Sequence, residues 1–547
     1  MSASEALLSA AGDDKAPGTP GPTGLGAPRP RRWLVTAVWV VGVLAAFAAY
    51  LQLARTRAVN SDGASQALQA WDMLHGNLLL HGWVLGDVSY YTTELPQYML
   101  VEFVRGLNQD VVHVAAAMTY TLATLLAALL AKGNATGRQA LARVLIAAGI
   151  MLAPQLASGV NILISSPDHI GTSMTVMVVW LILDRARPRW YVPVIAGTLL
   201  GWVEVADRLV LYIGLLPLAV VCAIRVGQAV AIERKPLAAQ WYDMALAAAA
   251  LVAAAAGVLA VHVIHAHGGF YMPAPSAQFA QSATTVARNL GITAQGFLLL
   301  GGADFLGLRL TASTVFIVLH VVGVFLAAWG TWLAARRFLR DRDLVAQLLV
   351  TGVAINLAAY VLSTKANVIS QTREIVAVLP FCAVLAGRLL AGRLQAGRLQ
   401  AAKLVPLLLV VLLGYVAGLG YEISQPAVAA QNQQLTSWLL ARHLHTGLSG
   451  YWESNVVTLT SGNRVQIRLV TQSGGRLIPA AFESRTDWYD PKRSTANFVV
   501  LSPGGGGYPG FTDKRAVLAT FGQPARSYQV GSYTILVWNR NLLSALG

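Results

Sequence analysis

The sequence predicts an all-α polytopic membrane domain of about eleven transmembrane helices, followed by an extracytoplasmic α/β domain. Two observations lead to this fold class. Of the 547 residues, 55% are apolar and only 12% are charged, about half the charged share of a soluble protein. Apolar runs of spanning length recur as far as residue 420, and the composition then changes to that of a soluble domain.

Eleven apolar segments approach the length that a helix needs to cross a hydrocarbon core of about 30 Å. They lie near residues 33–54, 111–131, 141–157, 168–184, 191–206, 208–225, 244–264, 312–334, 344–363, 374–390 and 403–420. Glu204, Asp207 and Arg208 interrupt the apolar run of the fifth and sixth segments, so this pair could instead form one long broken helix.

The distribution of basic residues predicts the orientation in a plasma membrane. Of the 40 Lys and Arg, 21 fall in the segments that are cytoplasmic if the N-terminus lies inside, and eight fall in the outer loops. Residues 1–32, rich in Gly, Pro and Ala, are expected to be a disordered cytoplasmic tail. A cleaved signal peptide is the alternative, but its leader would be unusually long. Residues 421–547 are then extracytoplasmic.

The net charge of +15 does not indicate a nucleic-acid partner, because the basic residues lie between apolar runs and form no basic face. Cys222 and Cys382 fall within apolar runs and show no CxxC spacing, so neither a disulfide framework nor a zinc site is indicated. The bilayer itself is the partner that the composition predicts.

Two predicted outer loops, 55–110 and 265–311, are too long to be simple connectors. In the first, an apolar face repeats at helical spacing between Ala64 and Leu74, and a weaker pattern follows near 95–107. Both are expected to be interfacial helices. The second loop carries a helix-like piece near 278–289. The α/β domain, 421–547, should begin with a helix at 431–445.

Further along this domain, the alternation of apolar residues predicts a β-hairpin formed by 456–460 and 465–469. Strands are expected at 497–502 and 532–538, with a short helix near 513–520 between them.

Three stretches of the first outer loop resemble a known family. They are Asn60-Ser61-Asp62-Gly63, Ala70-Trp71-Asp72-Met73-Leu74-His75-Gly76-Asn77 and Tyr90-Tyr91-Thr92-Thr93-Glu94-Leu95-Pro96. They are similar to the first loop of GT-C superfamily glycosyltransferases, particularly the polyprenyl-phosphate-mannose protein mannosyltransferase and aminoarabinose transferase group. The resemblance covers the membrane domain (33–420) in architecture and about 40 residues in motif.

The resemblance implies a membrane glycosyltransferase that uses a polyprenyl-phosphate sugar as donor. The acceptor would be a cell-envelope glycan, a lipid or a protein on the outer face, and transfer would usually invert the sugar. An acidic residue at the start of the first loop would be the base, which is Asp62 here. The family's Lys-Pro-Pro element is replaced by Glu94-Leu95-Pro96, so acceptor binding there does not carry over directly.

The chemistry of sugar transfer independently favours Asp62 as a catalytic residue. A carboxylate must take the acceptor proton at the membrane edge, and Asp62 follows the first span and starts a helix. Helix N-capping by Ser61 or Asp62 explains the same pattern without chemistry. Asp168, at the start of the fourth span, is the second catalytic candidate, although Pro167 followed by Asp168 is also an ordinary helix start.

The departing phosphate needs fixed cations, and three outer-side candidates lie at span ends: Arg373, Lys365 and Arg208. Snorkelling or pairing with Glu374 would also explain Arg373. Arg208 follows Asp207 and could be structural.

Candidates for binding the sugar or the acceptor are Asp87, Glu94, Tyr90, Tyr91, His169 and Tyr271. A divalent metal is left open. Its candidate ligands, Glu94, His262, His265 and His267, satisfy no fixed spacing.

Two rival functions remain at this stage. A lipid-linked saccharide transporter or flippase would carry internal repeats or mid-membrane charges, and only the group from Glu204 to Arg208 fits that pattern. A surface scaffold acting through its C-terminal domain would leave the two long loops unexplained.

Overall fold

The computed structural model describes residues 32–154, 162–165, 168–273, 277–308, 312–396, 398–430, 432–502 and 513–546. The chain divides into two compact units, residues 1–44 and 45–547. The predicted tail, 1–32, lies almost wholly outside the described residues, and so does the Gly-rich run at 504–507. Apart from residues 32–44, all described residues belong to the second unit.

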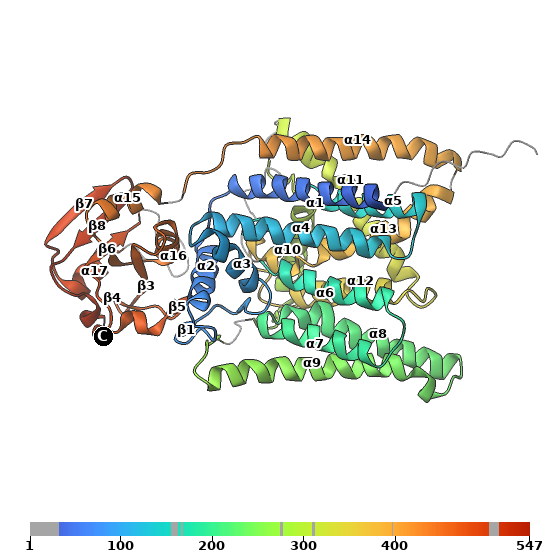
Figure 1. The fold of residues 1–547 in the computed structure, drawn as a ribbon, viewed down its shortest axis with the longest axis horizontal. Helices are drawn as coiled ribbons and strands as arrows, with labels where there is room; N and C mark the ends of the chain where they lie inside the picture. The colour runs from blue at the N-terminus through green and yellow to red at the C-terminus, as the bar shows by residue number, and fades with distance from the viewer. Residues whose placement is uncertain are drawn as a thin grey trace, which may run out of the picture. The chain divides into compact units, whose positions relative to one another are not determined.

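Helices occupy all eleven positions at which spans are predicted (Figure 1). They are α1 (Arg32–Arg55), α4 (Asp110–Lys132), α5 (Gly137–Met151), α6 (Ile170–Arg185), α7 (Tyr191–Ala206), α8 (Leu216–Gly227), α9 (Trp241–Ala266), α11 (Ala312–Arg336), α12 (Leu344–Val361), α13 (Val378–Ala396) and α14 (Arg398–Ile423).

Within the described residues, seven helical stretches are long and apolar enough to cross a membrane. An eighth is added if η4 (Ile369–Ile375) and α13, which bend by 56°, form one span. α5, α6 and α7 have only 15 or 16 residues. The protein is therefore a multi-pass membrane protein, and the number eleven stays a prediction.

The uncertain pair of spans is two helices. Asp207 has extended backbone angles and ends α7, and a π-helical turn, η1 (Leu211–Leu215), then leads into α8. α7 runs in the same direction as α9, with Gly197 beside Ala249 and Glu204 beside Gly257, whereas Arg225 near the end of α8 pairs with Asp243 near the start of α9. α7 and α8 therefore run in opposite directions, and the alternative of one long broken helix is wrong.

Ion pairs divide the loops and helix ends into two groups, as expected for a chain that crosses a membrane back and forth. Segments predicted to be outer meet at one end through the ion pairs Asp62–Arg373, Asp168–Arg373, His169–Asp207 and Lys365–Asp87. Segments predicted to be inner are joined to one another through Arg225–Asp243, Arg342–Glu233, Arg388–Asp184 and Arg388–Asp343. No ion pair among the described residues joins the two groups of segments.

The first long loop forms α2 (Ser61–Leu74) and α3 (Leu95–Arg105). α2 packs against α3 and against α16 (Tyr451–Thr460), and even its Gln66 and Gln69 are buried. α2 thus packs against other parts of the protein, and its position at a membrane surface stays a prediction. α3 exposes Phe103 and Val104, as an interfacial helix would.

The second long loop holds α10 (Ala283–Leu300), which is longer than predicted and begins at an N-cap, Ser282. Asn289 ties α10 to the end of α12, because its side-chain amide donates to the carbonyls of Val361 and Ser363 at 2.9 and 2.8 Å. This contact brings the loop to the end of the bundle that carries Asp62.

The C-terminal sheet region, residues 433–546, mixes helices and strands as the α/β prediction requires. Its elements are α15 (Gln433–Ala441), β2 (Thr446–Ser449), α16, β3 (Gln466–Ser473), β4 (Arg476–Pro479), β5 (Ser484–Arg485), η5 (Thr486–Tyr489), β6 (Phe498–Leu501), α17 (Lys514–Phe521), β7 (Arg526–Val530), β8 (Tyr533–Val537) and η6 (Leu543–Ala545). Six strands form one sheet in the order β4-β3-β2-β6-β8-β7, with β2 parallel to β3 and β6. The domain boundary at 420/421 stays a prediction.

The predicted β-hairpin is wrong in its first half, because residues 456–460 belong to α16. Val456 and Leu459 pack into the core beneath the first loop, whereas Val457 packs into the core of the sheet. Polar as well as apolar residues of α16 are buried, among them Ser454, Asn455 and Thr458, so its sequence lacks the one-sided apolar period that identifies helices.

Candidate active site

Asp62 lies in the first turn of α2 but does not cap the helix. The N-cap is Asn60, whose side chain accepts a hydrogen bond from the backbone N–H of Gly63 at 2.9 Å. The capping explanation for Asp62 is therefore wrong. Its Oδ1 accepts from the hydroxyl of Tyr451, and its Oδ2 lies 3.6 Å from Nη1 of Arg373.

Arg373 joins the two predicted catalytic acids. It lies in η4, and its Nη1 is 3.6 Å from Asp62 and 4.0 Å from Asp168. Glu374, the partner considered as an alternative, pairs instead with His169 and Lys365 at 3.8 and 3.6 Å. A guanidinium suits this position because its planar fork can serve two carboxylates at once.

Asp168 and His169 precede α6, which begins at Ile170, so the expectation that Asp168 lies in a first helical turn is wrong. His169 has a φ of +63°, a strained value for a non-glycine residue. Its Nδ1 is 2.8 Å from Asp207, and its Nε2 is 3.8 Å from Glu374. Carboxylates on both sides favour the imidazolium form.

Lys365 and Arg208 line one polar cavity of about 430 Å³ together with Asp87, His169, Tyr360 and Glu374. The ammonium of Lys365 lies 2.5 Å from Asp87. Burial alone would lower the pKa of Lys365, but Glu374 and Asp87 outweigh burial and raise it. This cavity therefore holds three basic side chains, Lys365, Arg208 and His169, together with three carboxylates, Asp87, Asp207 and Glu374.

Glu94, in the first long loop, is hydrogen-bonded to the first turn of α6. Its carboxylate is buried and accepts a hydrogen bond from the backbone N–H of Gly171 at 2.9 Å. A Cβ on Gly171 would come within 2.5 Å of this carboxylate, so a larger residue there would displace the Glu94 side chain. Burial, opposed by weaker hydrogen bonds, raises the pKa of Glu94 to about 7.

The metal candidates are not brought together. His262, His265 and His267 are exposed near the end of α9, whereas Glu94 is buried against α6. Among the described residues, no group of three or more His, Cys, Asp or Glu could hold a metal ion. This ligand set is therefore not supported.

Of the three predicted tyrosines, only Tyr90 lies at the site. It is buried, and its ring centroid is 6.1 Å from that of His169. Tyr91 donates to the carbonyl of Leu78 and packs on Phe270. Tyr271 packs against His265 instead.

Two residues of the sheet region that the sequence did not suggest complete the surroundings of Asp62. The hydroxyl of Tyr451 contacts Asp62 and also lies 2.6 Å from Oε2 of Glu483. Burial, and then the charge of Asp62, raise the pKa of Glu483 well above its usual range. A protonated Glu483 can donate a hydrogen bond to the hydroxyl of Tyr451, and that hydroxyl can donate to Asp62. Each of the two short contacts is then a hydrogen bond with one donor and one acceptor.

This arrangement predicts how stability depends on pH. Above about pH 4.3 an unfolded glutamate has lost its proton while folded Glu483 keeps it, so the free energy of unfolding falls as pH rises. Glu483→Gln removes this dependence. We expect the Tm of the variant, relative to the parent protein, to be higher at about pH 8 than at about pH 5. The same Tm difference at both pH values would contradict a neutral Glu483.

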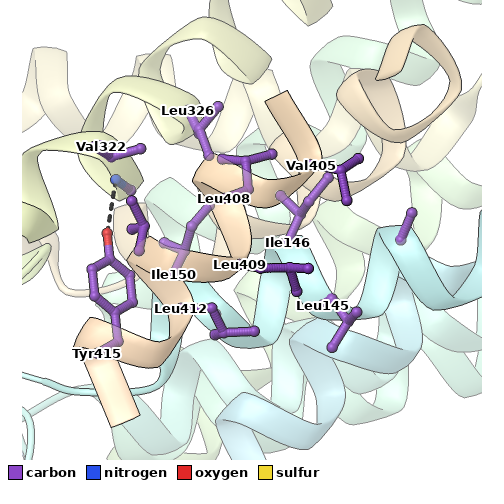
Figure 2. A pocket seen from close by; sticks show the side chains of 14 residues that line it. Leu145, Ile146, Ile150, Val322, Leu326, Val405, Leu408, Leu409, Leu412 and Tyr415 are labelled. Atoms are coloured by element: carbon purple, nitrogen blue, oxygen red, sulfur yellow. Dashed lines mark hydrogen bonds between the residues drawn. The ribbon is translucent and has the colours of Figure 1, made fainter. Parts of the chain in front are cut away.

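A different pocket, of about 160 Å³, lies between α5, α11 and α14 (Figure 2). Its lining is aliphatic apart from Tyr415, whose hydroxyl accepts from the backbone N–H of Gly323 at 3.0 Å. It contains neither an acid nor a cation. This pocket suits a hydrocarbon chain and lacks the groups that sugar transfer needs.

No protein-family model matches the chain, and no curated protein matches it. Its fold is similar to that of ArnT from Cupriavidus metallidurans in two crystal structures. The structure bound to undecaprenyl phosphate has a TM-score of 0.52 at 12% identity, over 92% of this chain and 98% of that one. The apo structure has a TM-score of 0.51 at 15% identity, over 94% and 99%. At this identity the likeness shows the fold alone: the chain shares the fold of ArnT.

Proposed function

We propose that the protein is a membrane glycosyltransferase that moves a sugar from a polyprenyl-phosphate donor to a hydroxyl of an acceptor. The observation that carries the proposal is the Asp62–Arg373–Asp168 cluster, because the residues that follow Asp168 and Arg373 in the chain, His169 and Glu374, line the polar cavity. A carboxylate base beside fixed cations is what this reaction requires. The fold of ArnT, solved with undecaprenyl phosphate, supports the donor class.

In the proposed mechanism, Asp62 takes the proton of the acceptor hydroxyl as its oxygen attacks the anomeric carbon. The bond from that carbon to the phosphate oxygen breaks, and the phosphate leaves with the bonding electrons. Attack opposite the leaving group inverts the sugar. Asp168 shares Arg373 with Asp62 and would help to hold the guanidinium in place.

Three cations are placed to stabilise the leaving phosphate. Lys365, His169 and Arg208 line the same polar cavity. Their electrostatic stabilisation of the phosphate would increase as negative charge develops on it, particularly where water is excluded. Arg373 would act at the border between this cavity and Asp62.

The proposal is tested by transfer of a labelled sugar from polyprenyl-phosphate sugars, with purified protein in detergent. Release of unlabelled polyprenyl phosphate together with a labelled acceptor supports transfer. In a sealed vesicle, movement of the intact donor across the membrane without cleavage of its sugar–phosphate bond would instead identify a flippase.

The orientation is a further part of the proposal: the end carrying Asp62 and the sheet region faces outward. We expect Ser502→Cys to react with an impermeant thiol reagent in intact cells, and Lys235→Cys, exposed in a predicted inner loop, to react only after lysis. Cys222 and Cys382 are both buried and give little background. The reverse labelling pattern would overturn the orientation.

A further inference from the structure

The first loop and the sheet region are joined along a seam. β1 (Trp83–Val84) pairs antiparallel with β5 (Figure 1). Next to this pair, Nη1 of Arg485 lies 2.9 Å from both carboxylate oxygens of Asp72. Arg485 also pairs with Asp487 at 2.6 Å, so its charge is matched within the protein.

The seam closes around a cavity of about 190 Å³ that is separate from the site of Asp62. This volume equals that of about six water molecules at roughly 30 Å³ each, so it suits a single small ring. Its walls combine aromatic rings with hydrogen-bonding side chains, as binding sites for small polar molecules do. Lining residues include Trp71, Trp83, Trp488, Asn463, Gln466 and Arg468, together with Asp72 and Arg485, whose charges pair with each other.

Arg468 lines this cavity, and no carboxylate among the described residues forms an ion pair with it. Its side chain is 6% exposed, yet its Nε has no hydrogen-bond partner among these residues. Gln466 accepts from its Nη2 at 2.5 Å, and the guanidinium lies 4.0 Å over the ring of Trp488. The ring offsets only part of the cost of burying a charge.

We propose that this cavity binds an acidic saccharide, meaning a sugar ring that carries a carboxylate or a phosphate. The anion would pair with Arg468, because a guanidinium binds both kinds of anion through two parallel hydrogen bonds. The Oδ1 of Asn463 accepts from Gln466 at 3.1 Å, so its side-chain N–H groups point to a ring hydroxyl as their partner, and Trp71 offers an aromatic wall. The cavity is thus a subsite for one sugar of the acceptor.

The position of the cavity fits a subsite remote from the reaction. Asp62 and Asp72 lie on the same helix, and ten residues at 1.5 Å each separate them by about 15 Å along α2. An acceptor held in the cavity would therefore present a different part of itself to Asp62. This role in acceptor binding rests on the proposed function, whereas binding of the acidic sugar does not.

The test measures binding without any donor. Full-length protein in detergent is titrated with glucuronic acid, glucose 6-phosphate and neutral glucose, and binding is followed by ligand-observed NMR. We expect at least one acid to bind saturably and about tenfold or more tightly than glucose, because a charge-assisted contact is at stake. Which acid binds better identifies the anion. Equal binding of glucose, or no saturable signal from either acid, overturns the inference.

Matched variants locate the site. Arg468→Gln should lose the preference for the acid, whereas Arg442→Gln should keep it, because Arg442 is an exposed arginine that also stacks on a tryptophan, Trp438. Acid binding that survives Arg468→Gln in a folded protein overturns the inference.

A second variant, Asn463→Gly, tests the same site if Arg468→Gln does not fold. Asn463 has a φ of +64°, a value that glycine adopts freely, so Asn463→Gly removes the amide and keeps the turn. We expect it to weaken binding several-fold, and unchanged binding would contradict the assignment. Asp62→Asn should bind the acid normally. If Asp62→Asn loses sugar transfer but still binds the acid, the result supports the proposed function and leaves this inference standing. If the parent protein transfers sugar but binds no acid, this inference is wrong and the proposed function stands.

Discussion

Asp62→Asn should insert and fold normally yet transfer sugar roughly 10²–10⁴-fold more slowly, the usual effect of losing a general base. Asparagine keeps the shape of the side chain and can still accept the hydrogen bond from Tyr451. It cannot take a proton. The helix keeps its cap because Asn60 supplies it, so the Tm should change little.

Turnover and Tm are measured together for this variant and for Asp341→Asn. Asp341 has a half-exposed side chain and pairs weakly with Arg337 at 3.8 Å, at the end of the helices away from Asp62. We expect the control to keep its turnover. A stable Asp62→Asn protein that retains most of its activity would remove Asp62 from the mechanism and direct attention to Asp168.

Arg373→Lys should weaken use of the polyprenyl-phosphate donor by about tenfold or more, because contacts of charged groups contribute roughly 1.5–3 kcal/mol each. The guanidinium lies within 4.0 Å of both Asp62 and Asp168. An ammonium is a single point of charge and cannot reproduce the fork. The loss should appear in kcat/KM for the donor.

Arg288→Lys is the matched control, since Arg288 is exposed on α10 and takes no part in the cluster. Its kcat/KM should stay at the parent value. Equal and negligible effects of the two changes would show that Arg373 does not act on the donor.

The sequence by itself determined where the helices lie. A helix in lipid must satisfy its backbone hydrogen bonds internally and must be apolar over a set length, so each span is specified by its own residues. The same local logic places the two helices of the first loop. The resemblance of the first loop and the positions at span ends single out Asp62, Asp168 and Arg373, and in the structure each of the two acids lies within 4.0 Å of Arg373.

The tertiary structure alone decided what covers the polar faces. α16 packs between two hydrophobic cores, and no periodic pattern in its sequence predicts that it is a helix. α2 is buried because α16 lies on it. Glu94 appeared free to bind a metal or an acceptor, but its carboxylate fills the space beside Gly171 on α6.

The surroundings of Asp62 show the same division most clearly. Tyr451 lies 389 residues further along the chain, and its partner Glu483 belongs to the sheet region. Neither residue belongs to a motif, and nothing in its neighbours marks it as functional. A contact between residues so far apart depends on how two folded surfaces meet, which a pattern read along one stretch of chain does not encode.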